Sequence, residues 1–136
     1  MFKILIHSDG RYPASRNIIR KSIVDTLARD HLENHQIEVS VAVVGSRKMQ
    51  ELAHSFLGDR EGHAVLAFPF EEVAAGGEAR RHGFVNFPDG TLRLGEIILC
   101  WPELVTCAGH DNVTVDREIY KLTSHAVGYL LGKHDE

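Results

Sequence analysis

Residues 36–44 read Gln-Ile-Glu-Val-Ser-Val-Ala-Val-Val, an alternation of apolar side chains with polar or small ones. Successive side chains of a strand point to opposite faces of the sheet, and β-branched residues are enriched in strands. The stretch therefore predicts a β-strand from Gln36 to Val44 with one face in the core. That face is formed by Ile37, Val39, Val41 and Val43.

The segments on either side of this strand have the period of a helix. From Arg16 to about Leu32, apolar residues recur every four positions and basic residues take the other side, which predicts an amphipathic helix. After the strand, Ser46 can cap a second helix that ends at Gly58. The apolar residues are Ile19, Ile23 and Leu27 in the first helix and Met49, Leu52, Ala53 and Phe56 in the second.

Further strands are predicted from short apolar runs. Phe2 to His7 is one, and His63 to Pro69 is another, closed by its proline. Residues 71–83 are rich in glycine, alanine and charge, which is typical of a mobile loop. Residues 84–94 surround a Pro-Asp-Gly turn and favour a hairpin. Residues 95–101 are almost continuously apolar and indicate a strand buried on both faces.

The C-terminal part has one weak and one strong pattern. Residues 102–113 favour irregular or weakly helical structure. Thr114 can then cap a last helix, with acidic residues in its first turns where the helix dipole favours them. Its apolar stripe is Ile119, Leu122, Ala126, Tyr129 and Leu130. The whole order predicts one domain over residues 1–136, an α/β (α+β) sandwich with helices packed on a mixed four-stranded sheet with an added hairpin.

Composition excludes several classes of protein. The chain has 136 residues, 43% of them hydrophobic, and a formal net charge of −4, so no global basic field points to nucleic acid. Arg80 and Arg81 are the densest local basic candidate, and a solvated surface pair is the alternative. No apolar run is long enough for a membrane span, and the N-terminus lacks the pattern of a signal peptide. We therefore expect a cytoplasmic protein with no membrane partner.

The cysteines do not suggest a structural metal or a disulfide. Cys100 and Cys107 are separated by seven positions with no second pair, which fits neither a zinc ribbon nor a disulfide framework. Cys100 ends an apolar run, so we expect a reduced core residue.

The tail carries the residues best suited to chemistry. Residues 121–136 read Lys-Leu-Thr-Ser-His-Ala-Val-Gly-Tyr-Leu-Leu-Gly-Lys-His-Asp-Glu. His125 lies on the predicted helix, and His134 and Asp135 lie just past the glycine that ends it. Imidazole and carboxylate groups bind zinc, so these three residues are the candidate metal ligands. A structural or solvated role is the alternative for each of them.

Three blocks together resemble the YbeY family of bacterial rRNA maturation factors, which are single-domain, metal-dependent endoribonucleases. The blocks are residues 51–58 with the strand His-Ala-Val-Leu-Ala-Phe-Pro at 63–69, the strand Leu-Gly-Glu-Ile-Ile-Leu at 94–99, and the tail from His125. The resemblance covers nearly the whole chain. It implies a zincin-like C-terminal helix, and in the family three histidines at the end of the chain bind zinc.

The chain departs from the family at several of these positions. The first family histidine falls on His125, but the second falls on Tyr129, a poor zinc ligand unless it is deprotonated. The third falls on Asp135, or on His134 if one residue is deleted. An arginine implicated in family activity falls on Leu57. A further departure is that the family's threonine-aspartate pair falls on His63 and Ala64, and His63 is a minor candidate for the missing ligand.

Two functions follow from the resemblance. The first is an endoribonuclease in rRNA maturation and ribosome quality control, in which zinc held by His125 with His134 or Asp135 activates a water molecule that cleaves RNA. The second is a metal-free relative that binds RNA or the ribosome without cutting. In both, RNA is the expected partner, with ribosomal proteins as a second class. A metal-dependent hydrolase of another substrate is a weaker third reading, and the chain has no His-Glu-x-x-His sequence.

Overall fold

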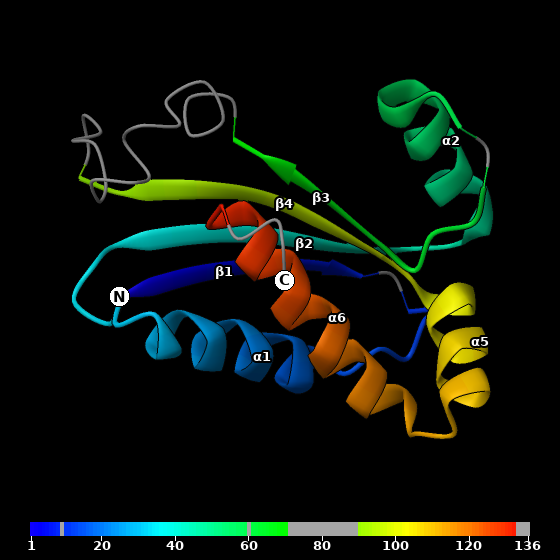
Figure 1. Ribbon diagram of the computed structural model, residues 1–136, viewed down its shortest axis with the longest axis horizontal. Coiled ribbons are helices and arrows are strands. Elements are labelled where there is room, and N and C mark those ends of the chain that lie inside the picture. The colour runs from blue at the N-terminus through cyan, green and yellow to red at the C-terminus, as the bar shows by residue number, and fades with distance from the viewer. Residues whose placement is uncertain (9, 60, 71–89, 133–136) are drawn as a thin grey trace.

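A computed structural model describes residues 1–8, 10–59, 61–70 and 90–132. Four strands form one mixed sheet in the order β1-β2-β4-β3 (Figure 1). Strands β1, β2 and β4 are parallel, and β3 runs antiparallel to β4. Their bounds are Phe2–Ser8 for β1, Ile37–Val44 for β2, Val65–Pro69 for β3 and Leu92–Cys100 for β4. The predicted mixed sheet is confirmed.

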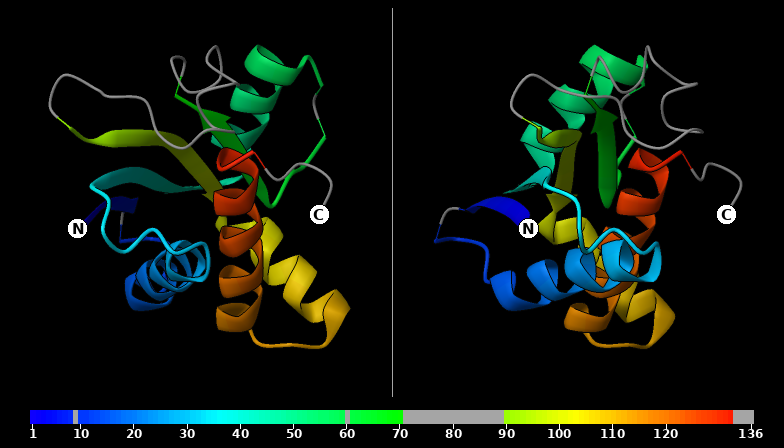
Figure 2. Two further views of the ribbon diagram at one scale, coloured as in Figure 1. Left: turned by 60° about the vertical axis from the view of Figure 1, so that its left-hand side comes forward. Right: turned by 90° about the vertical axis from the view of Figure 1, so that its left-hand side faces the viewer.

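Helices cover both faces of this sheet. Helices α1 and α6 lie side by side on one face, and α2 lies on the opposite face (Figures 1 and 2). Helix α5 connects the end of β4 to α6. The bounds are Arg16–Arg29 for α1, Ser46–Leu57 for α2, Trp101–Asp111 for α5 and Val115–Leu130 for α6. None of the helices in the described ranges is long and apolar enough to cross a membrane.

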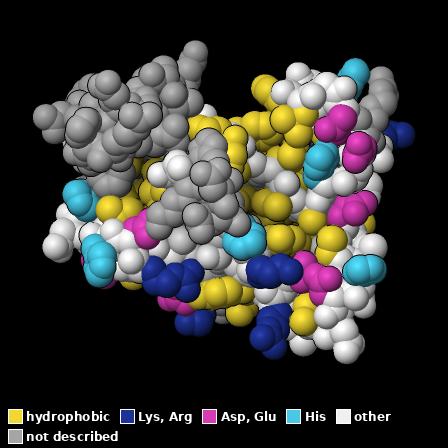
Figure 3. Space-filling model, in the orientation of Figure 1, with side chains coloured by type: hydrophobic (Ala, Val, Ile, Leu, Met, Phe, Trp, Pro, Cys, Tyr) yellow, Lys and Arg dark blue, Asp and Glu magenta, His cyan; other side chains and the backbone are white. Residues whose placement is uncertain are grey.

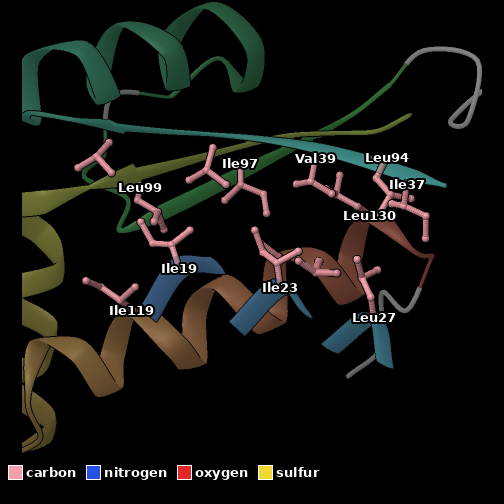
Figure 4. Packing of buried hydrophobic residues seen from close by; sticks show 14 of the residues in the cluster. Ile19, Ile23, Leu27, Ile37, Val39, Leu94, Ile97, Leu99, Ile119 and Leu130 are labelled. Atoms are coloured by element: carbon pink, nitrogen blue, oxygen red, sulfur yellow. The ribbon is translucent and has the colours of Figure 1, made fainter. Parts of the chain in front are cut away.

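The main core lies between the sheet and the pair α1 and α6. The odd-numbered residues of β2 point into it, as the alternation predicted, and all are at most 5% exposed. They meet Ile19, Ile23 and Leu27 of α1 and Ile119 and Leu130 of α6 (Figure 4). A smaller cluster under α2 covers the other face of the sheet. Its buried members are Met49, Ala53, Leu66, Ile98 and Cys100.

Strand β4 contains an irregularity that the sequence did not reveal. The prediction of a hairpin arm ending at Leu94 and a new strand from Gly95 is wrong for these residues, because Leu92–Cys100 is continuous. The register shifts here: Glu38 pairs with Arg93, but Val39 pairs with Gly95. Leu94 is the extra residue of a β-bulge. Because of the bulge, the core-facing positions change from even numbers before it to odd numbers after it. Leu92, Leu94, Ile97 and Leu99 therefore all reach the main core.

Two helix starts also differ from expectation. Residues 102–113, predicted irregular or weakly helical, belong largely to α5, which has Pro102 in its first turn. A proline is tolerated there because the first helical N–H groups have no partner within the helix. For α2, the N-cap is Gly45 and Ser46 is the first helical residue, and no side chain caps it. A Cβ at Gly45 would collide with the hydroxyl of Tyr12.

Some of the remaining predictions are confirmed, one is wrong, and others concern residues outside the described ranges. Thr114 caps α6 by accepting a hydrogen bond from the backbone N–H of Arg117, as expected. Cys100 is a buried free thiol, which is confirmed. Phe56, predicted on the inner face of α2, is 65% exposed and packs its ring 5.0 Å from that of Phe68. The expected loop at 71–83, with Arg80 and Arg81, and the hairpin turn at 84–89 lie outside the described residues.

Candidate functional site

A surface cavity of about 620 Å³ opens beside α6. It is bounded by the C-terminal halves of α1 and α6, by strand β3 and by the last residue of α2. Figure 3 shows the face that carries α6, where hydrophobic side chains lie between α6 and α2 and a histidine with Lys or Arg side chains borders them. The lining residues are Thr26, Arg29, Asp30, Leu57, Val65, Leu66, Ala67, Ser124, His125, Ala126, Gly128 and Tyr129.

Three lining residues are those to which the family resemblance assigned site positions. His125 and Tyr129 are one helical turn apart on α6, so they share one face of the helix. Leu57 comes from the end of α2 and is 53% exposed. The fold therefore brings the position of the first histidine, that of the second and that of the arginine to a single cavity. Tyr129, which the sequence placed in the apolar stripe of the helix, is 40% exposed and lines this cavity.

The other predicted ligands are placed differently. His134 and Asp135 lie outside the described residues, so their predicted role is not tested. Among the residues that the structure describes, no three His, Cys, Asp or Glu side chains are arranged to hold a metal ion. Within the cavity lining, His125 and Asp30 are the metal-capable side chains, and Asp30 was not singled out from the sequence. The described part of the cavity therefore holds two side chains of metal-binding chemistry and no complete ligand set.

His63 is engaged elsewhere. Its Nε2 lies 3.0 Å from Oδ1 of Asp59, and His63 is not among the residues that line the cavity. The hydrogen bond from His63 is the main reason that the pKa of Asp59 lies below its usual value. The structure therefore gives no support to His63 as a substitute for the missing ligand.

The polar wall of the cavity was missed by sequence reasoning. Nη2 of Arg29 donates hydrogen bonds to Oγ1 of Thr26 at 3.1 Å and to Oγ of Ser124 at 3.0 Å. The two hydroxyl oxygens are themselves 2.8 Å apart and join α1 to α6. Thr26 lies next to Leu27 on the buried side of α1 and is only 8% exposed. A hydroxyl on the apolar face of a helix needs a hydrogen-bond partner. The position of Thr26 beside Leu27 was therefore the sequence signal that could have pointed to a polar contact here.

A second polar contact joins the same helices farther from the cavity. The hydroxyl of Tyr120 donates to Oδ2 of Asp25 at 2.7 Å, and Lys21 also bonds that carboxylate. The hydrogen bond from Tyr120, followed by that from Lys21, lowers the pKa of Asp25 from its ordinary value. Ser22 adds a bond from its hydroxyl to the carbonyl of Tyr120 at 2.7 Å. The α1 wall is thus fixed to α6 by polar contacts as well as by the core.

A solved structure shares the fold. The solution structure of TM1509 from Thermotoga maritima superposes with a TM-score of 0.55 over 97% of this chain and 73% of that one. The sequences are 21% identical, so this likeness concerns the fold alone.

Sequence comparisons give the family. The family model described as "Endoribonuclease YbeY" matches residues 9–136. Proteins of that name are 32% identical over 98 residues in Thermodesulfovibrio yellowstonii and 30% identical over 115 residues in Caldicellulosiruptor bescii. These matches cover 72% and 85% of this chain, and 54% and 70% of the two relatives. The chain therefore spans about half the length of the first relative, and on the match of the family model it belongs to the YbeY family.

Proposed function

We propose that this chain is a metal-dependent endoribonuclease that acts on RNA in rRNA maturation in the cytoplasm, with the cavity beside α6 as its site. The observation that supports the proposal is the meeting of His125, Tyr129 and Leu57 in one cavity. Leu57 and His125 come from helices on opposite faces of the sheet. They therefore meet because of the fold and not because they are close in the sequence. The relatives named above carry the word endoribonuclease in their names.

The proposed metal is zinc, and His125 is its first ligand. His125 projects from α6 into the cavity lining, and His134 or Asp135 would complete the set from the chain after the helix. A zinc ion with three protein ligands and an open position lowers the pKa of a bound water to near neutrality. In this proposal, helix α6 holds the imidazole of His125 in place, and RNA enters the cavity along its polar wall.

Metal analysis and an RNA cleavage assay test the proposal together. Protein purified without chelator should contain stoichiometric transition metal and cut structured rRNA, and His125→Ala should lose both. His110→Ala is the matched control, because His110 lies on α5 with a side chain that is 88% exposed and does not line the cavity. Wild-type protein that binds no metal on zinc titration and leaves rRNA intact would refute the proposal.

The second candidate is a metal-free protein of the same family that binds RNA or a ribosomal protein. Two observations favour it: a tyrosine occupies the second ligand position, and a leucine occupies the arginine position in the same cavity. A phenol ionises with a pKa of about 10, so it is a poor ligand at neutral pH. Salt-sensitive binding of RNA without cleavage and without metal would favour this candidate over the nuclease.

A further inference from the structure

The cavity has two walls of different chemistry. Along β3 and the end of α2 it is apolar, with Leu57, Val65 and Ala67. Along α1 and α6 it is polar, and Arg29 is the Lys or Arg side chain among its described lining residues. Pockets of about 300–1,000 Å³ commonly hold small ligands, and a few polar groups on an apolar background fix the orientation of the ligand. The contrast between the walls suits a molecule with a flat apolar part and an anionic part.

The guanidinium of Arg29 is held by acceptors of known direction. The hydroxyl of Thr26 donates its one proton to the carbonyl oxygen of Ser22 at 2.7 Å. Thr26 must therefore accept in its contact with Ser124, so Ser124 is the donor of that hydrogen bond. Both hydroxyls then turn lone pairs toward Arg29, as its two hydrogen bonds require. The cation is oriented before any ligand arrives.

The contacts of Arg29 with the described residues use only part of its binding capacity. A guanidinium has five N–H donors, and within the described residues both hydrogen bonds of Arg29 come from Nη2, so these contacts do not use the donors of Nη1 and Nε. Within the described part of the chain, no carboxylate forms an ion pair with Arg29. The hydroxyls that orient the group are neutral, while the charge of Arg29 also helps to lower the pKa of Asp25, and Asp30 lines the same cavity. An arginine that is fixed but not neutralised is suited to a phosphate oxygen.

We propose that Arg29 binds a phosphate of single-stranded RNA, with the adjacent base against the apolar wall formed by Leu57, Val65 and Ala67. The inference rests on the proposed function for the identity of the ligand as RNA. In a chain of net charge −4, an oriented cation in a cavity supplies one local phosphate contact that the overall charge of the chain does not favour. Ser124 is a positioning residue, because it acts on the ligand through Arg29.

The test measures binding of a short, unstructured, fluorescently labelled RNA by polarisation over a series of salt concentrations. Arg29→Gln should weaken binding by about tenfold or more, the expected loss of a charge-assisted hydrogen bond. It should also lower the slope of log affinity against log salt by about 0.7, the value for one phosphate of a single strand. Arg20→Gln is the matched control, since Arg20 is an exposed arginine on the same helix that does not line the cavity.

Two further variants separate binding from folding. Arg29→Lys keeps the charge and should keep the wild-type salt slope while recovering part of the affinity, because an ammonium lacks the planar fork. Ser124→Ala should weaken binding less than Arg29→Gln, with an unchanged salt slope, because the cation remains but one of its two acceptors is lost. Thermal unfolding of each variant identifies any that does not fold.

The result that overturns the inference is equal binding by Arg29→Gln and Arg20→Gln, or a wild-type protein that does not bind the RNA. Cleavage is scored separately from binding. Wild-type protein that binds through Arg29 but does not cleave would refute the nuclease and leave the Arg29 contact standing. A wild-type protein that cleaves, with an Arg29→Gln variant that binds like Arg20→Gln, would refute the Arg29 contact and leave the nuclease standing.

Discussion

The side-chain oxygens of Thr26 and Ser124 lie 2.8 Å apart, although 98 positions separate them in the sequence. The contact crosses the interface of α1 and α6 and lies in the wall of the cavity. The same two hydroxyls orient Arg29. Packing of the two helices and the shape of the polar wall therefore depend on the same hydrogen bonds.

Thr26→Val should test this contact. Valine keeps the shape of threonine but removes the acceptor of Ser124 and one of the two acceptors of Arg29 at a partly buried interface. The free energy of unfolding should fall by about 1–2 kcal/mol, as expected for the loss of buried hydrogen bonds. Urea unfolding measures the change. Thr106→Val is the control, because Thr106 is exposed and its hydroxyl donates to the carbonyl of Pro102 in its own helix. Equal effects of the two substitutions would contradict the importance of the interface contact.

The contact between Tyr120 and Asp25 should make stability depend on pH. The pKa of Asp25 is lowered in the folded protein, first by the hydrogen bond from Tyr120 and then by that from Lys21. The stabilisation is present above the unfolded pKa of about 3.9 and is lost as the pH falls through the lower folded value. Tyr120→Phe should therefore destabilise the protein at neutral pH and much less in acid.

Urea unfolding of the wild type and of Tyr120→Phe at about pH 7 and about pH 3 measures this difference. Asp25→Asn removes the titrating group, so in that background the effect of Tyr120→Phe should no longer vary with pH. An effect of Tyr120→Phe that is the same at both pH values in the wild-type background would show that the ionised carboxylate is not the partner that matters.

Gly95→Ala should damage the bulge in β4. Gly95 has φ of +145°, which side-chain-bearing residues rarely adopt, and a Cβ there would collide with the carbonyl oxygen of Phe68. The Cα of Pro69 would lie 2.9 Å from it. We expect a loss of at least about 1–3 kcal/mol in the free energy of unfolding, the usual cost of such strain. Thermal or urea unfolding gives the value.

Gly109→Ala is the matched control for Gly95. Gly109 lies within α5, and a Cβ there would meet no atom within 4 Å. Alanine is the better helix former, so this variant should be neutral or more stable, by up to about 1 kcal/mol. If both glycines tolerated alanine equally, the bulge would not depend on the backbone freedom of Gly95.

Tyr129→His should strengthen metal binding at the cavity. It places a second imidazole one turn from His125 on the same face of α6, the spacing at which two side chains can bind one ion. Zinc affinity measured by calorimetry should rise by about tenfold or more, which corresponds to about 1.4 kcal/mol. Tyr129→Phe should bring no gain, and His125→Ala should abolish the gain of Tyr129→His. A gain that survives His125→Ala would place the metal elsewhere.

The failures of the sequence predictions have specific causes. Residues 102–113 were predicted as irregular or weakly helical, whereas most of them form α5, in which Pro102 stands in the first turn and disturbs no hydrogen bond. The continuity of β4 was missed because Gly95 and the change of parity after Leu94 imitate the boundary between two strands. Phe56 fits the apolar period of α2, but only one side of that helix, at Met49 and Ala53, is covered by the sheet.

Local pattern was enough for most elements of the fold. The sequence alone determined the alternation of apolar residues in β2, their recurrence every four positions in α1 and the cap at Thr114. Each of these is set by residues within a few positions of one another. The family positions at His125, Tyr129 and Leu57 could also be assigned without coordinates. Only the tertiary structure decided that Leu57 and His125 share a cavity and that Ser124 orients Arg29. Those contacts join distant segments, and their geometry depends on how the helices pack against one sheet, which no local pattern records.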